Sequence, residues 1–354
     1  MAHYEYARAH PLWETAKNGC SAGQRCDRGH ACRSRLDHRP SQARPRHTLG
    51  DDAVTQDPVS PRRTSALGAA VVCHSFGMRR STPSSTAQNV ALVRSHLTWL
   101  GVLDDRFAEG MLRPRWALLE KGMRWGPARR MGRNRTFAWL AARTHFFDDA
   151  VTSALAAGVR QVVVMAAGYD SRAWRLAHAG VRFYEVDHPA TQHDKRRRAP
   201  AGGPTYVPVE FGRDSLEDAL RLAGFRPDEP SVFTIEGVTM YLTEPQVRDL
   251  LETVRRLSAP ASRLAVNYGL GVEAAATRTS RVGALLARVQ FAMSGERITY
   301  RPAVAQAEAL LRDTGWCPQE TRTAPDLVRE YVAGTTLPTT DIRPSAFAVN
   351  AVVS

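Results

Sequence analysis

The chain has few cysteines and no long apolar run. No stretch of about 18 consecutive apolar residues occurs, so the sequence predicts no transmembrane helix. The five cysteines are an odd number and form no paired disulfide framework, which favours a reducing compartment. No basic start followed by an apolar stretch marks a secretory signal. We therefore expect a cytoplasmic protein with no membrane partner.

The sequence also lacks a complete G-x-G-x-x-G motif, but it contains the rest of a nucleotide-binding βαβ unit. Gln161–Ala167 is a continuous apolar run typical of a parallel strand buried on both faces, and Gly168 follows it at a turn. A second run, Val181–Val186, ends at Asp187, nineteen residues after the glycine. An acid at this spacing suits the two hydroxyls of a bound ribose. A ligand-free α/β sheet would also place glycine and aspartate at strand ends, and this segment alone leaves both readings open.

Further apolar segments indicate an open, mostly parallel sheet. Strands are predicted near residues 161–167, 181–186, 205–211, 231–236, 262–268 and 346–352, with a weaker one after Gly315. Ser85 and Thr86 can begin a helix that carries Val90, Val93 and Leu97 on one side. Thr243 and Gln246 form a capping box at the start of another helix. The alternation predicts an α/β fold whose ligands bind beyond the carboxyl ends of the strands.

Several motifs resemble those of one enzyme family. AAGYDSRAWRL followed by EVDHP is similar to the S-adenosylmethionine-dependent methyltransferases of the leucine carboxyl methyltransferase family, whose bacterial members include polyketide-tailoring enzymes. RTHFFDDAV at Arg143–Val151, YVPVEF at Tyr206–Phe211 and IEGVTMYLT at Ile235–Thr243 resemble further motifs of the family, in the family's order. The resemblance covers Ser85 to the C-terminus and is clearest from Arg143 to Tyr268. It implies a class I, Rossmann-like doubly wound sheet of seven strands, the last one antiparallel.

The resemblance also implies a division of the chain. We expect an N-terminal helical cap over residues 78–157 and a methyltransferase core over 158–354, with a helical lid at about 271–301. Residues 1–77 hold four of the five cysteines without regular periodicity. We expect them to be disordered, or to be an extension upstream of a natural start at Met78. The gaps between the potential zinc ligands in this segment differ from those of structural zinc sites, so no metal site is predicted.

The resemblance assigns roles to six residues around S-adenosyl-L-methionine. Arg143 would grip the carboxylate of its methionine end, because a guanidinium binds two oxygens at once. Gly168 would allow close backbone approach, and Asp187 would bind the ribose. Glu236 would complement the ammonium or sulfonium. The adenine edge would be formed by Glu210 and Phe211, where the family usually has an aspartate followed by an apolar residue.

The sequence indicates fewer residues of the acceptor site. Tyr241 follows the fourth strand and is the one candidate for a catalytic role, while Tyr268 ends the fifth strand. For both tyrosines the favoured interpretation is simple packing. An ionised carboxylate acceptor needs no general base, whereas a phenol would benefit from one. We assign no base.

Positive charge is concentrated in one block of the chain. The net charge is +13, and residues 113–135 contain eight Lys and Arg against the single acid Glu120. This block also contains Trp116 and Trp125, so it could face an acidic or planar substrate. A solvated basic helix or loop is the favoured interpretation, and it is also favoured for the later run Lys195–Arg198.

These observations favour an O-methyltransferase acting on a carboxylate or hydroxyl of a small molecule, in keeping with secondary metabolism. Three alternatives remain: a protein carboxyl methyltransferase, a nicotinamide-dependent oxidoreductase, and a non-catalytic nucleic-acid-binding protein. The incomplete glycine motif weighs against the oxidoreductase. A nucleic-acid-binding protein would show steep salt dependence of binding and no need for a cofactor. The sequence does not indicate the oligomeric state.

Overall fold

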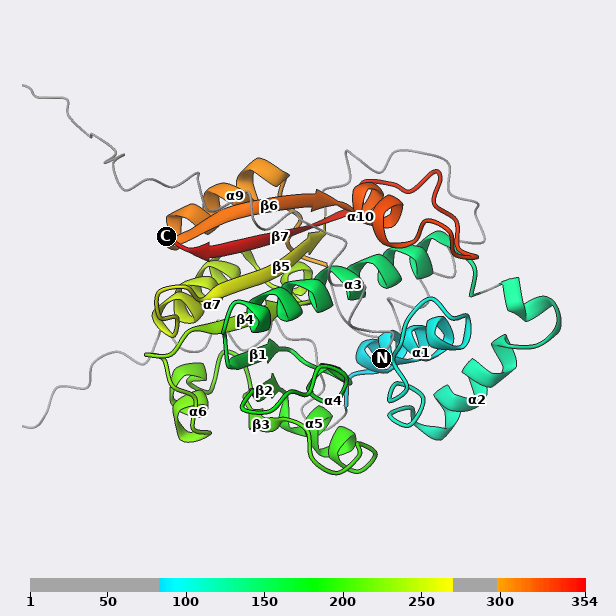
Figure 1. Cartoon of the computed structure of the whole chain (residues 1–354), viewed down its shortest axis with the longest axis horizontal. Coiled ribbons are helices and arrows are strands. Elements are labelled where there is room, and N and C mark those ends of the chain that lie inside the picture. The colour runs from blue at the N-terminus through cyan, green and yellow to red at the C-terminus, as the bar shows by residue number, and fades with distance from the viewer. Residues whose placement is uncertain (1–82, 131, 270–297) are drawn as a thin grey trace, which may run out of the picture. The chain divides into compact units, whose positions relative to one another are not determined.

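The computed structural model describes residues 83–130, 132–269 and 298–354, and a seven-stranded sheet lies at its centre (Figure 1). The strand order is β3-β2-β1-β4-β5-β7-β6. The strands are β1 (Gln161–Met165), β2 (Arg182–Asp187), β3 (Thr205–Pro208), β4 (Ser231–Ile235), β5 (Arg263–Gly269), β6 (Trp316–Thr323) and β7 (Ala346–Val353). Strands β1 to β5 pair in parallel, and β7 pairs antiparallel with both β5 and β6. The predicted doubly wound sheet with an antiparallel last strand is confirmed.

Both faces of the sheet are buried, because successive side chains of a strand point to opposite sides. On β1, Val163 and Met165 belong to one apolar cluster, and Val162 and Val164 belong to another. The first cluster also contains leucines of α6 (Leu216–Leu222), α7 (Glu244–Arg256) and α9 (Val304–Asp313). On the opposite face lie α3 (Arg135–Ala156), α4 (Arg172–Arg175) and α10 (Ala324–Tyr331). This two-sided cover explains the continuous apolar runs of the central strands.

The first described helices precede the sheet in the chain. They are α1 (Ser85–Trp99), α2 (Pro114–Met123), the short 3-10 helix η5 (Gly126–Arg130) and α3. Ser84 caps α1, one residue before the predicted start, and its Oγ accepts a hydrogen bond from the Ala87 N–H at 3.1 Å. Val93 and Leu97 of α1 are buried as expected. The α1 helix passes the carboxyl ends of the central strands (Figure 1).

Local sequence signals at α7 are confirmed. The backbone N–H of Thr243 donates to the Gln246 side chain at 2.8 Å, which is half of the predicted capping box. Pro245 lies in the first turn, where the missing N–H has no partner to lose. Helix α7 then buries one face of leucines and valines: Val247, Leu250, Leu251 and Val254.

Two local expectations were wrong in the extent of an element, and a third was wrong in the burial of a side chain. Strand β3 ends at Pro208 rather than at residue 211, because the Asp214 side chain accepts from the Glu210 N–H at 2.7 Å and turns the chain. Helix α4 has four residues, fewer than the expected helical stretch after Gly168. Lys195 was predicted on an exposed helix face, but in α5 (Pro189–Arg196) its side chain is fully buried against Glu185.

Two predictions concern residues that the structure does not describe. Residues 1–77 and most of the predicted lid at 271–301 lie outside the described residues. Within the described part of the chain, no helix is long and apolar enough to span a membrane.

Candidate functional site

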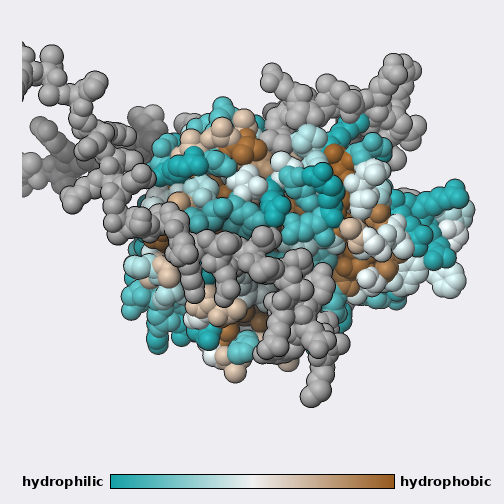
Figure 2. Space-filling model, turned by 45° about the horizontal axis from the view of Figure 1, so that its top comes forward, coloured by the Kyte–Doolittle hydropathy of each residue, from teal (hydrophilic) through white to brown (hydrophobic). Residues whose placement is uncertain are grey.

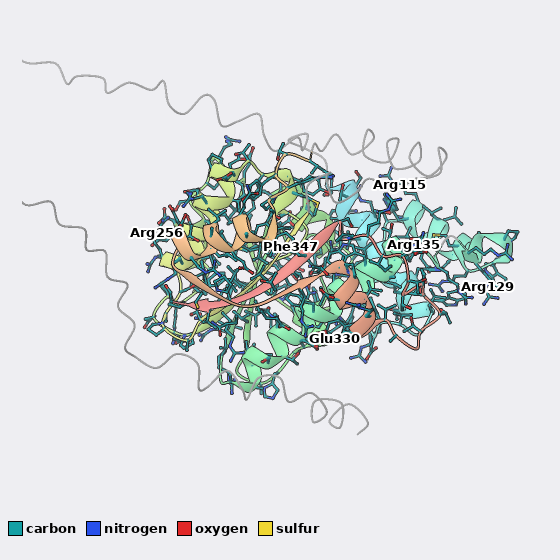
Figure 3. All side chains as sticks on the ribbon, turned by 90° about the horizontal axis from the view of Figure 1, so that it is seen from above. Arg115, Arg129, Arg135, Arg256, Glu330 and Phe347 are labelled. Atoms are coloured by element: carbon teal, nitrogen blue, oxygen red, sulfur yellow. The ribbon has the colours of Figure 1, made fainter. Side chains whose placement is uncertain are left out.

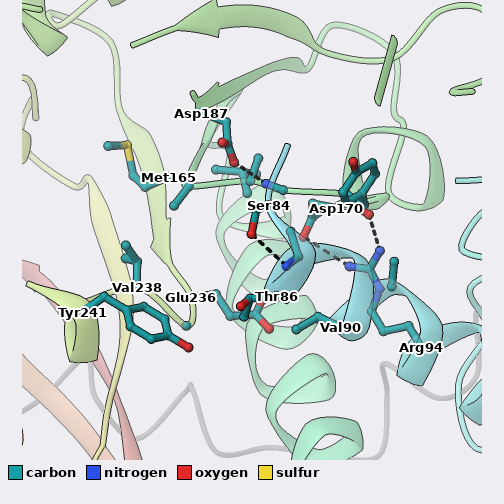
Figure 4. Close-up of a pocket in the computed structure, with 18 of the residues that line it drawn as sticks. Ser84, Thr86, Val90, Arg94, Met165, Asp170, Asp187, Glu236, Val238 and Tyr241 are labelled. Atoms are coloured by element: carbon teal, nitrogen blue, oxygen red, sulfur yellow. Dashed lines mark hydrogen bonds and ion pairs between the residues drawn. The ribbon is translucent and has the colours of Figure 1, made fainter. Parts of the chain in front are cut away.

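A pocket opens at the carboxyl ends of β1, β2 and β4, with α1 along one side (Figure 4). Five of the seven residues singled out from the sequence line it: Arg143, Gly168, Asp187, Glu236 and Tyr241. They come from positions as far apart as α3 and the segment after β4. The edge where parallel strands end is where ligands of open α/β sheets bind.

The turn after β1 shapes the floor of the pocket. Gly168 has a φ of +53°, and Ala166 has a φ of +49°, where the first glycine of a complete motif would stand. A Cβ added to Gly168 would lie 2.9 Å from the Cβ of Ala87, so α1 can pack on this turn only if residue 168 is glycine. Ala166 adopts a left-handed conformation at a cost of about 1 to 2 kcal/mol. The sharp turn therefore persists although the glycine motif is incomplete.

Asp187 lies in the pocket wall with both carboxylate oxygens held by the backbone. Its Oδ2 accepts from the Gly168 N–H at 2.5 Å, and its Oδ1 accepts from the His188 N–H at 2.6 Å. Burial raises the pKa of this carboxyl above its usual range, and the two backbone donors only partly oppose that shift. Each oxygen keeps lone-pair capacity for a second donor, as two ribose hydroxyls would require.

Arg143 and Glu236 meet at the other end of the pocket. The Arg143 Nε donates to Glu236 Oε1 at 2.8 Å, and Glu236 Oε2 pairs with Arg172 at 2.8 Å. The Arg143 side chain is 8% exposed and that of Glu236 is 14% exposed. A largely buried cation and anion side by side in a pocket can receive an amino-acid zwitterion without a change in net charge.

A buried ion-pair network supports this end of the pocket. The Arg172 side chain is 1% exposed and lies 2.7 Å from Asp148 and 2.6 Å from Asp170, in addition to Glu236. Although burial opposes ionisation, the charge of Arg172 contributes to holding the pKa values of Asp148 and Asp170 below their usual range. Arg94 of α1 approaches Asp170 at 3.8 Å and donates to the backbone carbonyl of Tyr169 (Figure 4). Through Arg172, this network holds the Glu236 side chain in position in the pocket wall.

Glu210 and Phe211 do not line this pocket. Glu210 accepts from Arg213 at 2.7 Å in the turn after β3. Phe211 lines a neighbouring pocket between α6 and α7, which shares Met165, Ala166 and Val238 with the first. The predicted adenine edge is therefore adjacent to the site rather than within it, and its role stays a prediction.

The two tyrosines differ in their surroundings. Tyr241 is partly buried and lines the pocket, with its ring directed toward it (Figure 4). Tyr268 is fully buried and stacks on Phe347 with ring centroids 5.2 Å apart. Burial raises the pKa of the Tyr268 hydroxyl well above its usual range. Tyr268 is thus a packed aromatic, whereas Tyr241 keeps its place as a candidate on the acceptor side.

Sequence reasoning missed Arg94, Asp170 and Arg172. Arg94 follows Val90 by four residues on the inward side of α1, and an arginine at such a position is a signal for a buried charge partner. The D-S-R run after Gly168 placed two charges at the strand end, but nothing local indicates that Arg172 reaches Glu236. Within the described ranges, no group of three His, Cys, Asp or Glu side chains could hold a metal ion.

Comparisons with known proteins agree on one family. The model of the family described as leucine carboxyl methyltransferase matches residues 86–255. A protein of Mycolicibacterium gilvum named "Putative S-adenosyl-L-methionine-dependent methyltransferase" is 36% identical over 206 residues, which cover 52% of this chain and 67% of that protein. A protein of Parafrankia sp. with the same description is 46% identical over 141 residues, which cover 38% of this chain and 46% of that protein. The chain thus spans about half of the Parafrankia protein.

Solved structures with a similar arrangement have low sequence identity. A putative methyltransferase of Thermobifida fusca is 16% identical, with a TM-score of 0.46, over 79% of this chain and 96% of that one. A member of the DUF574 family of Streptomyces avermitilis is 18% identical, with a TM-score of 0.46, over 78% of this chain and 100% of that one.

Proposed function

Because the chain belongs to the leucine carboxyl methyltransferase family, we propose that it transfers a methyl group from S-adenosyl-L-methionine to an oxygen of a small molecule. The observation that carries this proposal is the charge of the pocket. Its charged lining residues are two arginines, Arg94 and Arg143, and three acids, Asp170, Asp187 and Glu236. In a chain of net charge +13, this pocket has an excess of one negative charge, which complements a cofactor that carries one net positive charge.

The polar groups also fit the parts of this cofactor in order. Arg143 and Glu236 form an ion pair with each other in the structure. In the complex, Arg143 would instead contact the carboxylate of the cofactor and Glu236 its ammonium. Asp187 would accept both ribose hydroxyls. We further propose that the adenine lies toward Phe211, in the neighbouring pocket, with Glu210 near its edge.

The chemistry asks little of the chain beyond positioning. When bound, the cofactor supplies an electrophilic methyl group on a sulfonium. Arg143, Glu236 and Asp187 would fix its orientation, and Tyr241 would form part of the wall along which the acceptor oxygen approaches in line. Such alignment contributes on the order of 7 to 11 kcal/mol to lowering the barrier, so no covalent nucleophile is required. We propose a carboxylate or hydroxyl acceptor and assign no general base.

Calorimetry with the full chain tests the proposal. We expect saturable binding of S-adenosylmethionine and of its demethylated product, and none of a nicotinamide dinucleotide. Absence of saturable binding of the first two would refute the proposed function. Incubation with methyl-labelled cofactor and mixed carboxylic acids and phenols then identifies the acceptor class by mass spectrometry, because methyl esters are cleaved by mild base and aryl ethers are not.

Asp187→Ala is expected to weaken cofactor binding by about 1.5 to 3 kcal/mol, the range for hydrogen bonds to a charged group. Calorimetry measures the change. Asp187→Asn is the matched variant, since it keeps the shape of the side chain but loses the charge and one acceptor. If both variants bind the cofactor with unchanged affinity, Asp187 does not contact the ribose.

Cofactor affinity is expected to fall as the pH is lowered. Because burial raises the pKa of Asp187, this carboxyl takes up a proton at a higher pH than an exposed aspartate, and the protonated form accepts the ribose hydroxyls less well. Affinity is therefore retained above the raised pKa and lost as the pH falls through it. Titrations at a series of pH values measure this, and the Asp187→Asn variant should lack the component. An equal slope in both proteins would exclude Asp187 as its source.

Arg143→Lys is expected to weaken cofactor binding by about 1.5 kcal/mol, because one ammonium cannot reproduce the two-pronged contact with a carboxylate. Arg135→Lys on the same helix is the control, since Arg135 is exposed and pairs with Asp341 outside the pocket. Calorimetry should show a loss only for Arg143→Lys. Identical affinities in the two variants would remove Arg143 from the carboxylate site.

A further inference from the structure

Helix α2 buries one charged residue and exposes two leucines. Its glutamate, Glu120, is fully buried and accepts from the Arg124 Nε at 2.9 Å, with the His96 ring nitrogen 3.2 Å away. Leu118 is 74% exposed and Leu119 is 50% exposed. Large apolar side chains in contact with water on a helix that buries a charge need an explanation outside the core.

Three large exposed apolar residues lie in α2 or just after it. Leu118 and Leu119 are consecutive residues of α2, and Trp125, 76% exposed, follows the C-cap residue Arg124 just beyond the end of the helix. Arg115 precedes Leu118 by three residues on the same side. We call Leu118, Leu119 and Trp125 the α2 stripe.

Cations surround the α2 stripe. Arg115, Arg129, Arg130 and Arg133 are exposed, and no ion pair joins any of them to a carboxylate of the described residues. Two of them rest on aromatic rings, Arg115 on Trp116 and Arg129 on Trp99, each 5.6 Å from the ring centroid. Figure 3 shows Arg129 at the far end of the lobe that α2 and η5 form, and Figure 2 shows hydrophilic residues gathered at that end. The lobe is thus a projecting surface that combines tryptophan, leucine and arginine.

We propose that the α2 stripe docks peripherally on an anionic lipid bilayer. Exposed leucine and tryptophan side chains with arginines around them combine the apolar and cationic groups that peripheral membrane surfaces use, and arginines near anionic headgroups add attraction. A second copy is a poorer partner, because a symmetric contact would set these arginines against each other. Nucleic acid would use the arginines but leave the leucines without a role. The proposal departs from the expectation of no membrane partner, which rested on the absence of a spanning segment.

Sedimentation of the full chain with vesicles tests the proposal without any cofactor, so its outcome is independent of the proposed activity. We expect binding to phosphatidylcholine vesicles that contain phosphatidylglycerol, about tenfold weaker binding to pure phosphatidylcholine, and weakening with added salt. The double variant Leu118→Ser, Leu119→Ser should lose about tenfold in partitioning, and so should Arg129→Ala with Arg130→Ala. Thermal unfolding checks that the variants fold.

Two matched controls keep the test specific. Leu222→Ser removes a leucine that is 91% exposed on α6, and Arg197→Ala removes an exposed arginine at the end of α5. Neither should change vesicle binding. The proposal is overturned by no binding to either vesicle, by equal losses in the controls, or by a dimer in light scattering that Leu118→Ser dissociates. Displacement of vesicles by DNA that binds the leucine variant equally well would assign the surface to nucleic acid instead.

Discussion

Replacing Arg172 with methionine is expected to lower the free energy of unfolding by about 3 to 5 kcal/mol, the range for breaking a buried ion pair by removing one partner. Arg172 lies within 2.8 Å of each of three carboxylates, those of Asp148, Asp170 and Glu236, and its side chain is 1% exposed. Methionine fills much of the same space but leaves these acids without their shared cation. Urea unfolding of both proteins at neutral pH measures the loss.

The pH dependence of this loss has a definite sign. In the native protein the pKa values of Asp148 and Asp170 lie below their usual range, so their contribution to stability is present above the ordinary aspartate value and is lost as the pH falls through the folded values. In Arg172→Met these acids are less stabilised as anions. The difference in stability between the two proteins should therefore shrink in acid.

An exposed arginine provides the control for Arg172. Arg312 pairs with Glu308 at 3.1 Å, and its side chain is 60% exposed. Arg312→Met should change the free energy of unfolding by less than about 1 kcal/mol, because water screens such pairs. Arg172→Lys should fall between the two, since one ammonium cannot reach three carboxylates at once. A loss in Arg172→Met no larger than in Arg312→Met would show that the network does not stabilise the fold.

The sheet could be predicted because its central strands are continuous runs of apolar and small residues, which can be recognised in the sequence. Gln161–Met165 and Ser231–Ile235 are buried on both faces, and only a run of apolar and small side chains satisfies that condition. β6 was the weakest prediction for the converse reason. It is an edge strand with the sequence WCPQETRT, and most of its side chains are only partly buried, so no apolar pattern is required of it.

The candidate site was predictable where strand ends determine position. Asp187 and Glu236 follow directly from the ends of β2 and β4, since carboxyl ends of parallel strands share one edge. Arg172 was not predictable, because its partner Glu236 is 64 residues away and lies on another strand. Gly168 was predicted for a ligand, yet its nearest added contact is Ala87 of α1, which only the packed structure brings there.

Lys195→Met is expected to destabilise the fold by about 3 to 5 kcal/mol at a pH well above 7, where Glu185 is ionised in the native protein. The Lys195 Nζ lies 2.5 Å from Glu185 Oε2, and both side chains are at most 1% exposed. From the sequence, the run Lys195–Arg198 was interpreted as a solvated surface, but the side chain of its first residue, Lys195, is buried. Removing the ammonium leaves a buried carboxylate without its charge partner.

Glu185 gives this prediction its pH dependence. Burial raises the pKa of Glu185 to about 7, although Lys195 opposes the shift. The folded state therefore keeps a proton that the unfolded chain releases near its ordinary value of 4.5, so the native protein loses stability as the pH rises from there to about 7. Without Lys195 the folded pKa rises further. The loss caused by Lys195→Met should accordingly be small in acid and grow with rising pH.

A double variant separates the charge from the packing. Replacing Glu185 with leucine together with Lys195→Met removes both charges and keeps the volume, and such exchanges of buried pairs are often neutral or stabilising. Urea unfolding across the pH range should place the double variant within about 2 kcal/mol of the native protein, without the pH dependence that Glu185 confers. A single variant whose loss is the same in acid and in mild base would show that Lys195 contributes through packing alone, because only an ionisable partner makes the loss depend on protons.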